Sequence, residues 1–548
     1  MLATAEKTDR RWPRAWRGDA CRVTGAALHR ILHFSPKAKN GMSAQRITEI
    51  VIVGGGTAGW MTAAALSRLL TPDYSIRVVE SEEIGRIGVG EATIPMIKLF
   101  NGALGLEEGE FVRRTKGTFK LGIDFRDGGR VGHRYVHGFG SVGQDLGVVP
   151  FHQYWLKLRR AGGDAPLSAY SIAAHAGLAG KFMHAMPDRA ESPMATIAYA
   201  YQFDAALYAD ILRDYAQARG VQRIEGLITC ARQHAETGLL ESVALQDGRE
   251  VAGQLFIDCS GFRALLIEQT LHAGYEDWTH WLPCDSAVAV PCQSPPGNIE
   301  PFTRATARDA GWQWRIPLQH RVGNGHVFCS RYVGEDEATA TLLANLDGEP
   351  LAEPRLLRFN TGKRRRAWIG NVVAIGLSSG FMEPLESTSI HLIQSAIARL
   401  IALFPGTDFN AADINAYNMQ NDQEMEKIRD FLIAHYHITQ RDDTAFWRDC
   451  KHMAAVPDSL QHKMEVFRSH GRIFRDGNEL FAEPAWLQVM HGQLLEPAAH
   501  HPLTDAYPQE RIAAHLAGVR DVIARCVDAM PTHSDYLARV CDAGHAAA

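Results

Sequence analysis

The sequence predicts an α/β fold in which a parallel-sheet core carries inserted β-strands and is followed by a mainly helical C-terminal part. Three observations predict it. A glycine-rich turn over residues 54–59 joins an apolar strand to a helical segment. Apolar strands that end in small residues recur over 255–261 and 372–380, as expected where a discontinuous sheet regains a strand after an insertion. Beyond residue 410 apolar residues follow helical spacing, most clearly over 411–436 and 508–529.

The first strand and turn read VIVGGGTAGW over residues 51–60, with glycines at Gly54, Gly56 and Gly59. This pattern is typical of a dinucleotide-binding turn, because glycines allow a tight turn and a close approach of the backbone to a pyrophosphate. The amides at the start of the next helix, which we expect over 57–70, favour the phosphate oxygens. The alternative is a plain glycine-rich turn.

A second strand over 75–79 ends in Glu80. An acid at this position can accept hydrogen bonds from the ribose hydroxyls of a bound adenosine, which favours the dinucleotide interpretation. Residues 85–95 (GRIGVGEATIP) follow, with three glycines in six residues. Such a stretch can lie against a ligand or form a surface loop, and the glycines alone do not decide between the two.

The composition excludes several functional classes. With 548 residues, 46% hydrophobic and 22% charged, the chain is ordinary for a globular protein of two or more domains or one large composite domain. A net charge of −5 argues against a nucleic-acid-binding protein. The nine cysteines form no CxxC pair and the histidines no HExxH, so we expect no disulfide framework, no metal site and a reducing cytoplasm. No apolar run reaches membrane-spanning length, so we expect no membrane span.

Residues 1–41 differ from the rest of the chain because they are rich in arginine and poor in acids. They either form a transit-like peptide or precede the true translation start at Met42, and we favour the second interpretation. In both cases we expect a disordered N-terminal extension. We therefore divide the chain into this extension, a discontinuous core over 42–410 with an inserted sheet, and a helical C-terminal region over 411–548.

The apolar strand over residues 372–380 leads into the motif EPLEST over residues 383–388. A helix is predicted to follow over residues 389–404. The positive N-terminal end of that helix points back at the turn, so an anion could bind beside Thr388. Elsewhere, residues 88–95 read GVGEATIP and residues 311–317 read GWQWRIP.

Together with the glycine turn, these motifs resemble the flavin-dependent halogenases, the family typified by the tryptophan halogenases. GGGTAGW resembles their FAD turn and GVGEATIP the strap along the flavin, while GWQWRIP and EPLEST resemble their more specific WxWxIP signature and flavin and halide turn. The resemblance extends from about residue 47 to residue 447. It implies an FAD-binding domain of the glutathione-reductase and aromatic-hydroxylase type.

The resemblance also implies site residues. Lys120 matches the lysine that holds or reacts with hypohalous acid, and Glu386 matches the acid that assists substitution or accepts the ring proton. Trp312 and Trp314 match a pair that separates substrate from flavin, although two core tryptophans on one strand face would look the same. The implied cofactor-binding residues are Gly54, Gly56, Thr57, Ala58, Gly59, Glu80, Val89, Ala92, Gly376 and Leu377.

The implied halide-binding residues are Thr388 and Ser389, and the substrate-side residues also include His137 and Phe139. Ser389 stands where tryptophan halogenases commonly have glycine, so the choice between chloride and bromide is open. The segment 475–486 (RDGNELFAEPAW) lacks the aromatic and acidic cluster that grips free tryptophan in that subfamily. We therefore expect an indole-like or phenolic substrate.

The resulting hypothesis is a two-component halogenase that makes hypohalous acid from O₂ and halide with reduced FAD. We find one dinucleotide turn and no second one for a nicotinamide, so a separate NADH-dependent flavin reductase is implied; a homodimer is a further hypothesis. Two alternatives stay open: a single-component aromatic monooxygenase, which needs neither Lys120 nor Glu386, and a flavin-binding protein without turnover.

Overall fold

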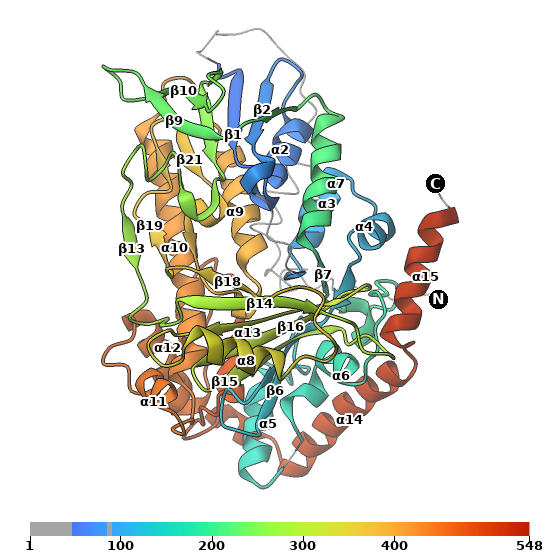
Figure 1. The fold of residues 1–548 in the computed structure, drawn as a ribbon. Coiled ribbons are helices and arrows are strands. Elements are labelled where there is room, and N and C mark those ends of the chain that lie inside the picture. Colours follow the sequence, from blue (N-terminus) through green and yellow to red (C-terminus); the bar gives the residue numbers. More distant parts are fainter. Residues whose placement is uncertain (1–45, 85–89, 164, 547–548) are drawn as a thin grey trace, which may run out of the picture.

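The computed structural model describes residues 46–84, 90–163 and 165–546 (Figure 1). The predicted N-terminal extension over 1–41 and the strap residue Val89 lie outside these ranges.

A six-stranded sheet forms the upper part of the molecule in Figure 1. Its strand order is β20 (Trp368–Ile369), β21 (Val372–Ala374), β12 (Leu255–Asp258), β1 (Glu49–Val53), β2 (Ser75–Glu80) and β8 (Gln222–Glu225). All neighbours pair in parallel except β20 and β21. The strands predicted at residues 75, 255 and 372 are confirmed, and segments distant in sequence meet beside the glycine turn.

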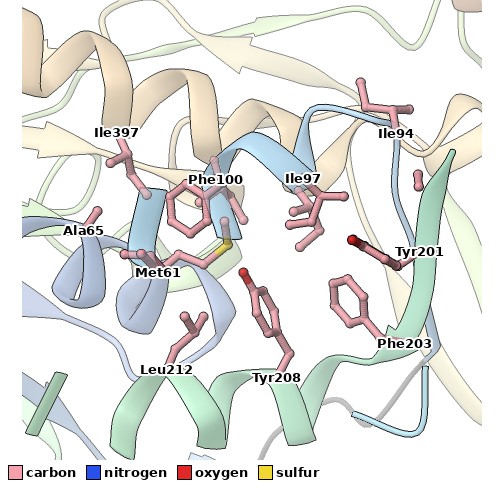
Figure 2. Packing of buried hydrophobic residues seen from close by; sticks show 14 of the residues in the cluster. Met61, Ala65, Ile94, Ile97, Phe100, Tyr201, Phe203, Tyr208, Leu212 and Ile397 are labelled. Atoms are coloured by element: carbon pink, nitrogen blue, oxygen red, sulfur yellow. The ribbon is translucent and has the colours of Figure 1, made fainter. Parts of the chain in front are cut away.

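Alternating side chains of β1 bury two different layers. Ile50 and Ile52 pack into the core shared with helices α2 (Thr57–Leu69), α3 (Ile97–Leu104), α7 (Ala205–Gln217) and α9 (Ser389–Ala402). Figure 2 shows this packing, with Met61 of α2 between Phe100 of α3 and Leu212 of α7. Val51 and Val53 pack on the other face against a small antiparallel sheet, β9 (Ile228–Gln233), β10 (Leu240–Leu245) and β11 (Glu250–Ala252). The two-residue period of a strand thus fixes a three-layer arrangement.

A seven-stranded sheet crosses the middle of the molecule (Figure 1). Its strand order is β18 (Arg355–Arg358), β14 (Ser286–Cys292), β17 (Val322–Phe328), β16 (Gly311–Pro317), β15 (Phe302–Arg308), β5 (Gly122–Arg126) and β6 (Arg134–Gly138). Its pairs are antiparallel except β15 with β5. The strands of this sheet come from residues 122–138 and 286–358, which lie in sequence between the strands of the six-stranded sheet.

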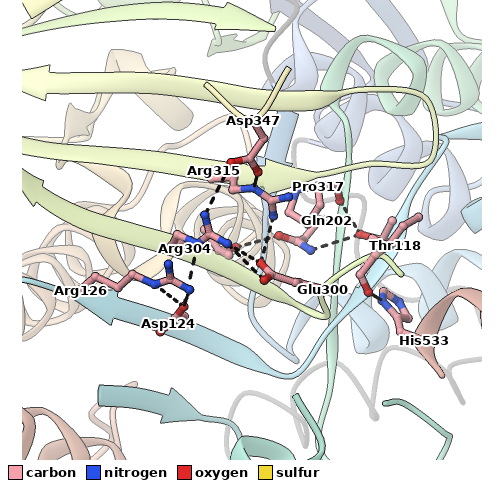
Figure 3. A network of polar contacts seen from close by, with 12 residues as sticks. Thr118, Asp124, Arg126, Gln202, Glu300, Arg304, Arg315, Pro317, Asp347 and His533 are labelled. Atoms are coloured by element: carbon pink, nitrogen blue, oxygen red, sulfur yellow. Dashed lines mark hydrogen bonds and ion pairs between the residues drawn. The ribbon is translucent and has the colours of Figure 1, made fainter. Parts of the chain in front are cut away.

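Strand β16 separates two environments. Trp312 and Trp314 share one face, whereas Gln313 and Arg315 lie on the other. Figure 3 shows the polar network beyond that second face, in which Arg315 pairs with Asp347 and Glu300 and neighbouring Arg304 also contacts Glu300. The charged face keeps the strand in register, so the two tryptophans are directed to the opposite side.

Helices from the C-terminal region pack around this sheet. The long α10 (Ala411–His437) runs beside both sheets, and the later helices of this region lie mainly in the lower part of Figure 1. The later helices are α11 (Ala445–Lys451), α12 (Asp458–His470), α13 (Glu483–Gly492), α14 (Gln509–Asp528) and α15 (His533–Ala546). Earlier parts of the chain contribute α4 (Glu108–Arg114), α5 (Phe151–Arg160), α6 (Ile172–Leu178) and α8 (Glu335–Leu343).

Two three-stranded sheets complete the fold. One consists of β3 (Gly90–Ala92), β7 (Ala200–Asp204) and β4 (Thr118–Lys120), and the other of β13 (Tyr275–Asp277), β19 (Gly362–Arg364) and β22 (Gly380–Phe381). Within the described ranges, no helix combines the length and apolarity needed to cross a membrane.

Candidate active site

A cavity of about 780 Å³ extends between the two large sheets. Its walls include the glycine turn and Glu80 at one end and Trp312, Trp314 and Ser387 at the other. This volume lies within the range of roughly 300–1,000 Å³ that is typical of small-molecule sites. The cavity therefore joins the predicted FAD turn to the predicted substrate side.

The glycine turn is fixed by steric limits. Gly54 has φ +110°, and a Cβ there would lie 2.3 Å from the carbonyl oxygen of Cys259. A Cβ on Gly59 would lie 1.9 Å from the carbonyl oxygen of Gly54. Gly56 lines the cavity, and a Cβ there would meet no atom of the described residues within 4 Å. Gly54 and Gly59 thus form the turn, whereas Gly56 leaves room for a ligand that approaches the backbone of Thr57 and Ala58.

Glu80 stands at the cavity wall where the sequence predicts an adenosine-binding acid. Its carboxylate accepts a hydrogen bond of 3.3 Å from Trp60 Nε1 and pairs with Arg223 of β8. A Cβ on Gly55 would overlap the Glu80 carboxylate, so this packing requires a glycine at residue 55. Sequence reasoning missed Arg223, because only the pairing of β2 with β8 brings it to Glu80.

The remaining predicted cofactor residues meet at the same cavity. Ala92 of β3, Gly376 and Leu377 line it. Gly376 has φ +78°, and a Cβ there would lie 2.9 Å from Cβ of Ala58. The segment that follows β21 therefore packs closely on the start of α2. Glu91 also lines the cavity, and burial raises the pKa of its carboxyl to about 7.

Lys120 and the EPLEST turn are in direct contact. Lys120 ends β4, its side chain is fully buried, and Nζ donates a hydrogen bond of 2.7 Å to Oγ of Ser387. Ser387 follows a short 3₁₀ helix, Pro384–Glu386, and has φ +59°, a conformation that costs energy for a residue other than glycine. Burial lowers the pKa of Lys120 to about 7, although the nearby charge of Glu386 opposes this shift.

Two histidines hold Glu386. His137 Nδ1 shares a hydrogen bond of 2.9 Å with Oε2, and His435 Nε2 lies 2.8 Å from Oε1. Burial raises the pKa of a carboxyl, but His137 and His435 outweigh burial here and lower the pKa of Glu386 to about 2. Glu386 is therefore a buried carboxylate that stays ionised. The sequence does not predict the contact between His435 and Glu386.

The predicted halide residues stand at the beginning of α9. Thr388 is the N-terminal flanking residue of the helix, and its buried Oγ1 has no hydrogen-bond partner within the described part of the chain. Ser389, the first residue of the helix, lines the cavity. An orphaned hydroxyl beside the free amides of a helix N-terminus fits a bound anion.

A buried carboxylate fixes the tryptophan pair. Trp312 Nε1 donates a hydrogen bond of 2.6 Å to Oε2 of Glu383, and the hydroxyl of Tyr436 donates to the same oxygen. Burial raises the pKa of Glu383 to about 7, while these two hydrogen bonds oppose the shift. The ring centroids of Trp312 and Trp314 are 6.1 Å apart, and both rings line the cavity. Sequence reasoning also missed this role of Glu383, although it lies in the EPLEST motif.

Aromatic rings close the substrate side. The Lys120 ammonium lies 5.4 Å from the ring centroid of Phe139. The ring of His137 lies 6.3 Å from that of Phe481, which stacks at 3.7 Å on Phe431 of α10. Phe481 comes from the C-terminal stretch that departs from the tryptophan-gripping pattern. Apolar rings therefore border His137 from this direction.

Comparison with known proteins decides the family. The sequence profile described as tryptophan halogenase matches residues 49–509 of the chain.

This chain belongs to the tryptophan halogenase family.

Named relatives cover almost its whole length. The chain is 37% identical over 532 residues to the 7-chloro-L-tryptophan 6-halogenase KtzR of Kutzneria sp. (strain 744), across 90% of this chain and 99% of the relative. It is 32% identical over 527 residues to the tryptophan 7-halogenase RebH of Lentzea aerocolonigenes, across 90% and 98%.

Solved structures of the family share the fold. Xcc4156, a flavin-dependent halogenase from Xanthomonas campestris, is 48% identical with a TM-score of 0.87, and the match covers 91% of this chain and 99% of that one. BrvH, a flavin-dependent halogenase from Brevundimonas sp. BAL3, is 47% identical with a TM-score of 0.87, across 90% and 99%. The predicted family and the α/β fold class are confirmed, and this tryptophan halogenase family member is a flavin-dependent enzyme.

Proposed function

We propose that this halogenase uses reduced FAD, O₂ and chloride or bromide to make hypohalous acid, and that Lys120 directs the acid to an electron-rich indole-like or phenolic ring. One observation supports this most strongly. The buried Lys120 ammonium binds the EPLEST turn one residue from the ionised Glu386, so the cation and carboxylate that the substitution needs lie together.

The chain fits the cofactor. The glycine turn and the start of α2 would hold the pyrophosphate of FAD, Glu80 its ribose, and Ala92, Gly376 and Leu377 the flavin end of the cavity. Bound reduced FAD supplies the two electrons that convert O₂ and halide to hypohalous acid and water. Thr388 and Ser389 would hold the halide. Trp312 and Trp314 would keep the substrate ring away from the flavin.

Lys120 suits its proposed role because burial brings its pKa to about 7. Near neutral pH both the ammonium and the amine are then populated. The ammonium can donate a hydrogen bond to hypohalous acid, and the amine can be halogenated to give a milder electrophile. Either form keeps the oxidant beside the ring. We expect this positioning to accelerate the reaction by about 10²–10⁴-fold, the range typical of general acid–base catalysis.

Glu386 completes the substitution. The bond between halogen and oxygen in hypohalous acid breaks as the halogen bonds to a ring carbon, and the hydroxide leaves as water with a proton from the Lys120 ammonium. The ring carbon then carries both hydrogen and halogen, and the cationic ring loses its proton to the carboxylate of Glu386 as aromaticity returns. A carboxylate that His137 and His435 keep ionised can stabilise the cation and take that proton.

The substrate is proposed from what borders His137. KtzR and RebH are named for tryptophan substrates. In this chain Phe481, from the divergent segment 475–486, stacks on Phe431 beside His137. We therefore propose a ring without the charged amino-acid group, such as indole or a phenol. From the sequence, we also propose that the protein works with a separate NADH-dependent flavin reductase, lies in the cytoplasm and forms a homodimer.

Mass spectrometry of products tests the proposal. Reactions contain the protein, FAD, a flavin reductase with NADH, and a panel of indoles, phenols and tryptophan with bromide or chloride. We expect a halogen isotope pattern on indoles or phenols, and none with Lys120→Met. The ratio of brominated to chlorinated product in wild type and Ser389→Gly defines the halide preference. Addition of one oxygen without halogen would instead establish a monooxygenase, and halogenation confined to tryptophan would contradict the proposed substrate.

A further inference from the structure

A chain of polar side chains leads away from Glu386 along strand β6 of the seven-stranded sheet. His435 Nε2 faces Oε1 of Glu386 at 2.8 Å, and its Nδ1 lies 3.1 Å from the hydroxyl of Tyr135. Nε2 of Gln493 donates a hydrogen bond of 3.0 Å to that hydroxyl. These three residues come from α10, β6 and the segment after α13, so only the tertiary structure aligns them.

A second, small cavity lies beside this chain of side chains. His435 and Gln493 line a space of about 30 Å³ together with Gly128, which is partly exposed. This volume is enough for one water molecule, which needs at least about 10–15 Å³. The small cavity shares Trp312 with the large cavity, but the glycine turn lines only the large one among the described residues.

The proposed catalytic cycle requires that a proton be removed from Glu386 after each substitution. Each substitution leaves one proton on Glu386, which is 1% exposed and shut off from solvent by its surroundings. A low pKa makes Glu386 a carboxylate that gives the proton up readily, provided that an acceptor is in contact. Glu386 must lose this proton before it can serve the next substrate.

We propose that His435 and Tyr135 form a proton relay that returns Glu386 to its ionised state after each halogenation. His435 Nε2 takes the proton from Oε1 of Glu386, and the proton on Nδ1 passes to the oxygen of Tyr135. The hydroxyl proton of Tyr135, a partly exposed residue, then passes to water. One proton enters the relay and one leaves it, and no electron moves.

The surrounding packing supports a relay rather than a site for a ligand. The ring of Tyr135 stacks on Phe125 at 4.9 Å, and Phe125 also contacts the ring of His435 at 4.8 Å. The two relay residues are thus held by the same phenylalanine. Gln493 donates to the Tyr135 oxygen and so leaves the Tyr135 hydroxyl proton free to point toward His435 or away from it.

Tyr135→Phe removes the hydroxyl and keeps the stacked ring. In rapid-quench reactions with indole, bromide and reduced FAD, we expect one equivalent of bromoindole per active site at the wild-type rate, because Glu386 starts ionised. Later turnovers should be slower by about tenfold or more, within the roughly 10²–10⁴-fold weight of positioned proton transfer. Tyr215→Phe, which loses a hydroxyl bonded to the Leu104 carbonyl far from this site, serves as the matched control and should match wild type in both phases.

Chemical rescue of a His435 variant distinguishes proton transfer by His435 from structural support of Glu386. His435→Ala leaves a space that 4-methylimidazole can fill with both ring nitrogens available, whereas 1-methylimidazole has no N–H to pass on. We expect the first compound to restore later turnovers and the second to fail. Equal rescue by both, or equal first and later turnovers in Tyr135→Phe, would overturn the relay. The inference rests on the proposed function, whose own failure would differ: wild type would then give no halogenated product at all.

Discussion

Lys120 Nζ donates a hydrogen bond of 2.7 Å to Oγ of Ser387, and this contact ties the end of β4 to the turn that opens α9. Ser387 adopts φ +59°, so the turn carries backbone strain at the point where it receives the lysine. The position of Lys120 therefore depends on the turn that also carries Glu386 and the proposed halide residues.

Replacing Ser387 by alanine tests this dependence. Ser387→Ala removes the acceptor but leaves the backbone and the flavin end of the cavity unchanged. We expect FAD affinity to stay within about twofold, while the rate of halogenation falls about tenfold, the effect of losing one hydrogen bond to a charged group. Fluorescence titration of FAD and product quantification measure the two effects. Ser242→Ala on β10, whose Oγ bonds Glu250, is the control; an equal loss in both variants would contradict the assignment.

Burial of Lys120 predicts a pH-dependent stability. Its pKa falls from 10.5 to about 7 on folding, so between these values the unfolded chain binds more protons and stability rises with pH. Below about pH 7 the folded protein carries a buried charge, a penalty of a few kcal/mol at about 1.4 kcal/mol per pKa unit. We expect Lys120→Met to raise the free energy of unfolding more at about pH 6 than at about pH 9.

Urea denaturation at the two pH values measures this difference. Lys451→Met, which removes a lysine whose Nζ donates to the Gln440 carbonyl at 3.4 Å, is the control and should show the same small effect at both pH values. A gain for Lys120→Met that does not change with pH would show that the lysine keeps its ordinary pKa.

The glycine turn predicts two separable defects. Gly54→Ala places a Cβ 2.3 Å from the Cys259 carbonyl oxygen at φ +110°, so the apoprotein should lose several kcal/mol of stability. The added methyl group of Gly56→Ala meets no atom within 4 Å in the described part of the chain, so the apoprotein should unfold like wild type. Its methyl group nevertheless enters the space we assign to the pyrophosphate, and FAD affinity should fall by about tenfold or more. Thermal unfolding without FAD and FAD titration separate the two; unchanged FAD binding in Gly56→Ala would place the pyrophosphate elsewhere.

Two replacements of Glu383 should differ in their effects on stability and halogenation. Trp312 and Tyr436 both donate to Oε2 of Glu383. Glu383→Gln keeps an oxygen acceptor of the same shape, so we expect it to fold and halogenate nearly as wild type. Glu383→Leu leaves two buried donors unsatisfied, at about 1–3 kcal/mol each, and should destabilise the protein and loosen Trp312. Urea denaturation measures the stability loss, and trapping with monochlorodimedone measures escaped hypohalous acid. Similar behaviour of both variants would remove Glu383 from the support of the tryptophan wall.

The sequence by itself determined the core of this fold. The strand–glycine–helix order at residues 51–69, the strands at 75, 255 and 372 and the long C-terminal helices follow from local rules of side-chain period and turn geometry, and the structure confirms them. The motifs also fixed the family, because WxWxIP and EPLEST are short segments whose residues act together within a single strand or turn.

Only the tertiary structure decided how distant residues combine. Arg223 reaches Glu80 through strand pairing, Ser387 reaches Lys120 across 267 positions of sequence, and His435 meets Tyr135 across 300. No local pattern encodes such contacts, because each partner has an ordinary sequence environment and the pairing depends on how sheets and helices pack. The same packing removes Lys120 and Glu386 from water, and this burial, together with the two histidines, sets the charges that the proposed chemistry requires.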